Sequence, residues 1–208
     1  MSVDSYVNLG NQIVYERTGG EIMSAGPASN TFRVDASRRR SLRRAREKAG
    51  VAVPKLYWED FTPGQVSEYG AYEVTADEIK AFAAEFDPQP MHLDEEAARA
   101  SMIGGLCASG WHSCAIMMRI IADGFVLDTA SMGATGCGEV KWLAPVRPGD
   151  RLRVRMHVID KRASKSRPEM GFVNARLDML NAADVCVMTL TPHFMIERRP
   201  AGGAEARA

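Results

Sequence analysis

The chain has 208 residues, of which 46% are hydrophobic and 25% charged, and its formal net charge at pH 7 is zero. This composition is typical of one soluble globular domain with extensions, and the balanced charge gives no indication of a nucleic-acid partner. None of the four cysteines (Cys107, Cys114, Cys137 and Cys186) belongs to a C-x-x-C pair. We therefore expect a reduced, cytoplasmic protein without a signal peptide or a membrane-spanning segment.

Residues 1–54 are expected to be a basic extension without regular structure. The first fifty residues contain 9 Lys+Arg against 5 Asp+Glu, a balance of +4. The arginine cluster at 38–46 can be read as a weakly helical extension, an organelle transit peptide or a nucleic-acid patch. Interspersed acids argue against a transit peptide, and no aromatic residue interleaves with the arginines. We favour an extension that carries no chemistry, with neither nucleic acid nor a membrane as partner.

The folded domain is expected to cover residues 55–196, followed by a disordered tail at 197–208. Residues 68–75 are typical of a strand that leads into a helix. Thr75 is a suitable N-cap for that helix, and Glu78 completes a capping box. Apolar residues then recur at helical spacing (Ile79, Phe82, Ala83 and Phe86).

The helix is expected to stop at the segment from Asp87 to His92, which contains Pro88 and Pro90. A proline removes one backbone N–H and disfavours the helical conformation in the residue before it. The segment is therefore predicted to be a stiff, extended, non-helical turn. Such a turn can direct Asp87 and His92 toward a common point.

A second short helix is predicted at 94–100, with Asp94 as its N-cap. A long helix of about 15 residues then opens at Ser109 or Gly110 and ends at Asp123-Gly124. Its apolar residues cover every face, so we expect other elements to surround it.

Four strands are predicted after this helix, at 139–146, 151–160, 173–179 and 185–196. From Arg151 to His157 polar and apolar residues alternate cleanly, which gives the sheet one dry face. Pro192 indicates an edge or bulge position in the last strand. The simplest packing wraps the dry face of an antiparallel sheet around the long helix. This α+β architecture is the hot-dog fold.

The run Asp87-Pro88-Gln89-Pro90-Met91-His92, with Gly110 eighteen residues after His92, resembles the signature of the MaoC-like hydratases. These proteins are also called R-specific enoyl-CoA hydratases. In that family Asp-x-Asn-Pro-x-His is followed by a short helix and then by a glycine that opens the central helix. The segment 140–150 also fits, and the resemblance covers about residues 56–196. Two positions depart from the pattern: Gln89 stands where Asn is usual, and Ser109 where many members have His.

The resemblance implies a hydratase or dehydratase acting on an enoyl or 3-hydroxyacyl thioester, with coenzyme A as part of the substrate and neither a cofactor nor a metal. The chemistry of the residues agrees. Hydration needs a base for water, an acid for the α-carbon and a donor for the enolate oxygen. We expect Asp87 and His92 to be the acid/base pair. The donor is the N–H of Gly110 at a helix N-terminus. Gln89 and Ser109 are candidate substrate-binding residues.

Two further residues are candidates for binding the substrate. His112 is read either as part of the pocket or as a helix residue with a satisfied hydrogen-bond partner. Arg167 lies in a basic turn at 160–169, which is read either as a solvated loop or as a contact for coenzyme A phosphates. His157 is expected to lie on the surface.

Two other functions remain open from the sequence. One is a hot-dog acyl-CoA thioesterase, in which water attacks the thioester carbonyl. The other is a non-catalytic acyl-thioester-binding subunit, which the departures at Gln89 and Ser109 permit. The carrier can be coenzyme A or an acyl carrier protein. The resemblance also implies a homodimer, in which the sheets of two copies pair and each pocket lies near the interface.

Overall fold

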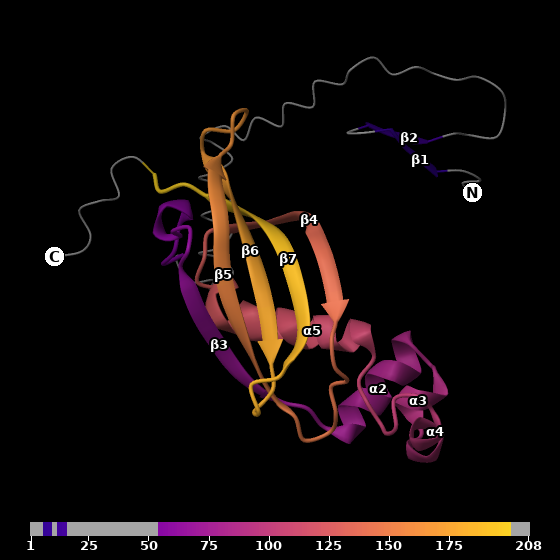
Figure 1. The fold of residues 1–208 in the computed structure, drawn as a ribbon. Coiled ribbons are helices and arrows are strands. Elements are labelled where there is room, and N and C mark those ends of the chain that lie inside the picture. The colour runs from indigo at the N-terminus through magenta and orange to yellow at the C-terminus, as the bar shows by residue number, and fades with distance from the viewer. Residues whose placement is uncertain (1–5, 10–11, 16–53, 201–208) are drawn as a thin grey trace, which may run out of the picture. The chain divides into compact units, whose positions relative to one another are not determined.

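The computed structural model describes residues 6–9, 12–15 and 54–200 (Figure 1). In the N-terminal unit, β1 (Tyr6–Leu9) and β2 (Gln12–Tyr15) form a two-stranded antiparallel sheet. These strands differ from the expectation that residues 1–54 lack regular structure. A Gly-Asn dipeptide between two runs that contain β-branched and aromatic residues is typical of a hairpin. The arginine cluster at 38–46 lies outside the described residues.

The described part of the second unit, residues 54–200, contains a five-stranded antiparallel sheet in the order β3-β5-β6-β7-β4, together with the helix α5 and three shorter helices (Figure 1). Its elements are β3 (Val66–Glu73), α2 (Ala76–Phe86), α3 (Pro90–Leu93), α4 (Glu95–Ala100), α5 (Gly110–Ile121), β4 (Ser131–Trp142), β5 (Arg151–Ala163), β6 (Met170–Leu180) and β7 (Cys186–Glu197). A 3₁₀ turn at Trp58–Asp60 precedes β3, and a π-helical turn at Ala122–Val126 extends α5.

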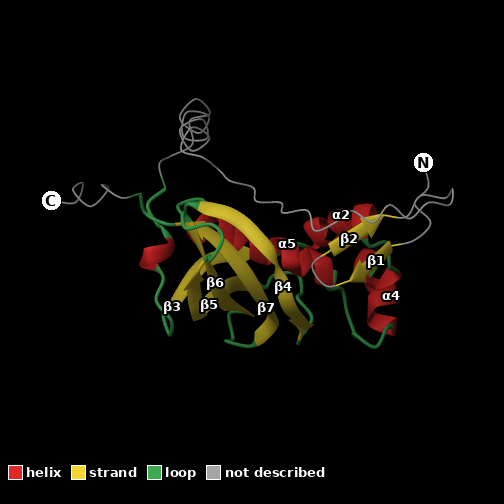
Figure 2. Cartoon of the chain, turned by 90° about the horizontal axis from the view of Figure 1, so that it is seen from above, coloured by secondary structure: helices red, strands yellow, loops and turns green. Residues whose placement is uncertain are grey.

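The core lies between α5 and one face of the sheet (Figure 2). Met117 of α5 and the inward residues Leu152, Val154 and Met156 of β5 are fully buried. Full burial of an aliphatic side chain of this size contributes about 1.5–3 kcal/mol, so this layer is the main source of stability. The predicted alternation in β5 and the predicted hot-dog architecture are confirmed.

One face of α5 is uncovered in this chain, contrary to the expectation that other elements surround the helix. The exposed residues Trp111, Ala115 and Met118 follow helical spacing, and the exposed fractions of Trp111 and Met118 are 64% and 48%. The edge strand β4, whose last residue Trp142 reaches the first residue of α5, is exposed over most of its length. Some apolar residues of α5 therefore remain exposed to solvent in the single chain.

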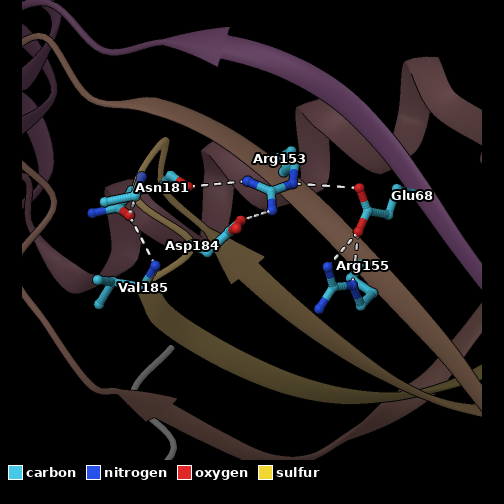
Figure 3. A network of polar contacts seen from close by, with 7 residues as sticks. Glu68, Arg153, Arg155, Asn181, Asp184 and Val185 are labelled. Carbon is cyan, nitrogen blue, oxygen red and sulfur yellow. Dashed lines mark hydrogen bonds and ion pairs between the residues drawn. The ribbon is translucent and has the colours of Figure 1, made fainter.

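The outer face of the sheet is polar and carries a network of cross-strand ion pairs (Figure 3). Glu68 of β3 accepts hydrogen bonds from both Arg153 and Arg155 of β5. Arg153 also donates to the carbonyl of Asn181 and to the carboxylate of Asp184 in the β6–β7 turn. Such exposed pairs contribute little stability individually, but they mark this face as the wet side of the sheet.

The predicted helix after Thr75 is confirmed, because the Thr75 hydroxyl accepts the N–H of Glu78. The predicted non-helical turn is wrong at its second half. Pro90 begins the single-turn helix α3, which contains His92. A proline at the first helical position is favourable, because its missing N–H would have no intrahelical partner there. Only Asp87 to Gln89 remain non-helical.

The predicted strands differ from the observed ones mainly at their ends. β4 begins eight residues before the predicted start, since its glycine-rich first half has no clear alternation. Pro192 does not lie in an edge strand, because β7 runs between β6 and β4. It pairs with Cys137 between two register shifts, as a bulge position would.

The described domain also continues past the predicted boundary at 196. Glu197 belongs to β7, and the next two residues return to the 3₁₀ turn. Arg198 pairs with Glu59, and the Arg199 guanidinium bonds both carboxylate oxygens of Asp60. Among the described residues, none of the helices has the length and hydrophobicity needed to cross a bilayer.

Candidate active site

Asp87 is positioned by the end of α2. It is the C-cap of that helix, and its backbone N–H donates to the carbonyl of Ala83. Pro88 follows at once, so the helix cannot continue, and the N–H of Gln89 turns back to the Asp87 carbonyl at 2.7 Å. The side chain of Asp87 thereby leaves the helix axis and is 18% exposed.

His92 is buried in the single turn of α3, with 4% of its surface exposed. Its Nδ1 lies 2.9 Å from the carbonyl oxygen of Cys107. A carbonyl can only accept a hydrogen bond, so Nδ1 carries the proton and Nε2 is the basic nitrogen of the neutral ring. Nε2 lies 3.7 Å from Oδ2 of Asp87. The expectation that the segment brings these two groups together agrees with this geometry.

Ser109 connects Asp87 to the start of α5. It is the N-cap of that helix, and its buried hydroxyl accepts the N–H of Trp111 at 3.2 Å. The same hydroxyl donates to Oδ2 of Asp87 at 2.5 Å. Gly110 is the first residue of α5, where backbone N–H groups lack intrahelical partners and the helix dipole favours negative charge. The N–H groups at the start of α5, which can bind an anionic oxygen, therefore lie at the same cavity as the Asp87–His92 pair.

Two hydrogen bonds lower the pKa of Asp87. The bond from Ser109 is the larger influence and the bond from the Gln89 amide, at 2.8 Å, is the second. Partial burial opposes them, and His92 adds a smaller lowering. The Gln89 amide therefore still donates a hydrogen bond to Asp87, although its side chain is one methylene longer than that of Asn. Asp87 is held as a carboxylate, with one protein donor on each oxygen.

These groups open into a cavity of about 570 Å³. Asp87, His92, Ser109 and Gly110 line its polar part. The remainder is mainly apolar and is lined by Met91, Met102, Ile103, Cys107, Ala108, Trp111, Trp142, Leu143, Ala144, Pro145 and Val146, with Gln89 and Ser113 as further polar members. A few converging polar groups in an apolar cleft of this size are typical of a small-molecule site.

A comparison with protein families matches residues 60–176 to the MaoC like domain. The match includes the Asp87–His92 segment, all of α5, the strands β3, β4 and β5, and the first part of β6. The chain belongs to the MaoC-like family. A MaoC-like dehydratase from Rhodospirillum rubrum is 45% identical, with a TM-score of 0.66 over 70% of this chain and 99% of that one. The family and fold expected from the sequence are thus confirmed.

Two other comparisons extend this picture. The uncharacterized protein YdeM of Bacillus subtilis is 35% identical over 141 residues, which are 67% of this chain and 98% of that protein. The R-hydratase PhaJ1 of Pseudomonas aeruginosa superposes with a TM-score of 0.57 over 69% of this chain and 86% of that one. At 23% identity, this similarity shows a shared fold.

His112 and Arg167 do not line the MaoC-like cavity. His112 is buried, and its ring stacks on Phe82 at 4.6 Å between centroids. Its Nδ1 has no hydrogen-bond partner within the described part of the chain, so the expected satisfied partner is missing. Burial lowers the pKa of His112, and the charge of Glu78 opposes this. Arg167 bonds Glu169 in the β5–β6 hairpin, at the end of the sheet opposite α2–α4 (Figure 1).

Three contributions to the cavity were missed from the sequence. Cys107 holds His92 through a backbone carbonyl, a group that every residue carries and that gives no sequence signal. Arg147 holds the cavity wall by donating to the carbonyls of Ile103 and Leu106. Trp142 lies against Gly110 from the end of β4. Arg147 and Trp142 both lie in the segment 140–150, whose resemblance to the family is the sequence signal for them.

Proposed function

We propose that this chain adds water to an enoyl thioester, or removes it from the 3-hydroxyacyl thioester. In this proposal Asp87 and His92 form the acid/base pair, and the N–H of Gly110 binds the thioester oxygen. Membership of the MaoC-like family and the 45% identity to the Rhodospirillum rubrum dehydratase support hydratase/dehydratase activity in general. The assignment of residues rests on the geometry of the site.

One observation carries the proposal. The basic Nε2 of His92 and Oδ2 of Asp87 lie 3.7 Å apart at the cavity wall, beside the first N–H groups of α5. Both atoms are hydrogen-bond acceptors when His92 is neutral, so a single water molecule can donate one hydrogen to each. The oxygen of that water is then fixed, and its lone pair is free to attack a carbon.

Hydration proceeds with a closed proton balance. The water oxygen bonds to the β-carbon while one water proton passes to the pair. The electrons of the double bond move to the thioester oxygen, where Gly110 N–H and the helix dipole stabilise the developing charge. The pair then returns one proton to the α-carbon, and the enzyme regains its starting state. Dehydration is the same path in reverse, and the hydroxyl and the proton of water add to one face of the substrate.

The test follows the conjugated-thioester absorbance of crotonyl-CoA together with free thiol. We expect the wild-type chain to remove the absorbance without releasing thiol. Asp87→Asn keeps the size of the side chain, so it should fold but lose about 10²–10⁴ in kcat. Equal rates for the two proteins would contradict the role of Asp87. Thiol release would instead indicate a thioesterase, and tight binding without turnover a non-catalytic subunit.

We further propose that two copies associate through the uncovered face of α5 and the edge strand β4. The face is apolar at Trp111, Ala115 and Met118, and β4 offers a long unpaired edge next to it. An exposed edge of twelve residues is a template for pairing with another strand. A second copy of the same chain presents both features in matching form, as a two-fold interface requires.

A further inference from the structure

The N–H of Gly110 must keep a fixed direction if it is to bind the thioester oxygen, although Gly110 is a glycine. Glycine has more backbone freedom than any other residue, so its N–H is the least fixed by local sterics. The site is therefore expected to contain contacts that restrict it. On one side, Ser109 accepts the N–H of Trp111 and so ties the peptide that follows Gly110.

The other restraint comes from Trp142, thirty-two residues further along the chain. Its indole Nε1–H donates to the carbonyl oxygen of Gly110 at 2.9 Å. Both polar ends of the Gly110–Trp111 peptide are thus bonded to side chains, one from the N-cap and one from the edge strand. With this peptide fixed, rotation on the carbonyl side of Gly110 is limited. The preceding peptide, which carries the Gly110 N–H, is held through the Ser109 carbonyl, which accepts from the N–H and the hydroxyl of Ser113. Both peptides around the glycine are then held, so its N–H keeps one direction.

The indole also explains why residue 110 is a glycine. A β-carbon at this position would lie 2.7 Å from Cε2 and 2.9 Å from Nε1 of Trp142, which is closer than real contacts allow. The ring therefore covers the space that a side chain would occupy. Trp142 also lines the cavity, and its ring meets that of Trp111 edge-on at 5.8 Å.

We propose that Trp142 is the positioning residue of the oxyanion donor: its indole N–H fixes the Gly110 peptide and its ring forms the wall over Gly110. This inference rests on the proposed function, because it assigns Trp142 to the same thioester site. It adds a residue from the edge strand to a site otherwise built from α2, α3 and α5. The role is one of orientation, so it should appear in kcat more than in KM.

The first test compares Trp142→Phe with Trp58→Phe. Both changes remove an indole N–H that donates to a backbone carbonyl, because Trp58 Nε1 bonds the carbonyl of Phe172 at 3.2 Å. Trp58 lies outside the cavity and serves as the matched control. With crotonyl-CoA we expect Trp142→Phe to lower kcat about tenfold, a fraction of the 10²–10³ for a lost donor, with KM within about twofold. Trp58→Phe should keep the wild-type kcat.

The second test is a cycle of Gly110→Ala and Trp142→Ala, read by thermal unfolding. In the wild-type background the added methyl meets the indole, so Tm should fall by about 3–8 °C. In the Trp142→Ala background the clash is gone and alanine is the better helix residue, so the same change should raise Tm by about 1–4 °C. This sign reversal does not depend on catalysis. Light scattering on every variant checks that assembly is unchanged.

Each outcome has one meaning. Full kcat in Trp142→Phe, from an active wild-type enzyme, overturns the positioning role and leaves the proposed function standing. The same loss of Tm from Gly110→Ala in both backgrounds overturns the contact itself. A wild-type chain that hydrates no enoyl-CoA overturns the proposed function, and the positioning role falls with it even if the Tm cycle reverses sign.

Discussion

Ser109→Ala is the change that separates the two roles of one hydroxyl. That hydroxyl caps α5 by accepting the N–H of Trp111 and orients Asp87 by donating to Oδ2. Losing an N-cap costs about 1 kcal/mol. Losing a hydrogen bond to a carboxylate costs about 1.5–3 kcal/mol, and the 18% exposure of Asp87 lets water recover part of it. We therefore expect a total of about 2.5 kcal/mol, or a Tm lower by about 5–10 °C.

The matched control is Thr75→Ala, which removes the N-cap of α2. Thr75 is exposed and its hydroxyl accepts only the N–H of Glu78 among the hydrogen bonds of the described residues. It should lose about 1 kcal/mol, or about 2–4 °C in Tm, and keep the wild-type kcat. Ser109→Ala should in addition lower kcat about 10- to 100-fold, because Asp87 is no longer held in its productive orientation.

The pH dependence of stability tests how the bonds from Ser109 and Gln89 act on the pKa of Asp87. In the wild type the bonds from Ser109 and Gln89 lower the pKa of Asp87, so the carboxylate persists below the ordinary value of about 3.9. Its contribution to stability is complete above about pH 4 and is lost as the pH falls through the lowered pKa. Ser109→Ala removes the main cause of the lowering, so the loss of Tm as the pH falls below about 4 should be smaller in this variant than in the wild type. An unchanged kcat with a Tm loss equal to that of Thr75→Ala would refute this reasoning.

Two further predictions concern the helices. Burial lowers the pKa of His112, so the unfolded chain binds its proton first and stability should fall as the pH drops below about 6.5. His112→Phe keeps the stack on Phe82 and removes the unpaired nitrogen, so thermal melts from pH 7 to 5 should show a smaller loss than the wild type; an equal loss would exclude His112 as the cause. If the proposed dimer forms, Ala115→Glu places a charge in its interface on the exposed face of α5 and should yield monomers by sedimentation. Ala84→Glu, the same change on the exposed side of α2, should not.

Much of the fold was predictable because its signals are local. The cap at Thr75, the alternation between Arg151 and His157 and the apolar run of α5 each follow from neighbouring residues and hold in the structure. The error at Pro90 has the same origin. Proline disfavours a helical conformation in the residue before it, but it is itself favourable as the first residue of a helix. The local pattern did not decide whether Pro90 continues a non-helical turn or begins a helix.

The site was predictable only in part, for a related reason. Asp87 and His92 lie close in sequence, and the step to Gly110 follows a family spacing, so these could be placed together. Trp142 reaches Gly110 only because β4 ends beside the start of α5, and the alternation of one strand does not specify that register. Arg167 pairs with Glu169 in the β5–β6 hairpin, at the end of the sheet opposite α2–α4, so its contact with a coenzyme A phosphate stays a prediction.

The environment of Asp87 also indicates different roles for the two members of the proposed acid/base pair. Each of its oxygens already accepts a hydrogen bond from the protein, and these bonds lower the pKa of Asp87. Such a carboxylate is a weak proton acceptor. Nε2 of His92, by contrast, has a free lone pair in the tautomer that the Cys107 carbonyl imposes. We infer that His92 takes the proton in either direction, while Asp87 orients the water and stabilises the imidazolium that forms. A negative charge fixed at 3.7 Å serves that purpose best when it does not itself become protonated.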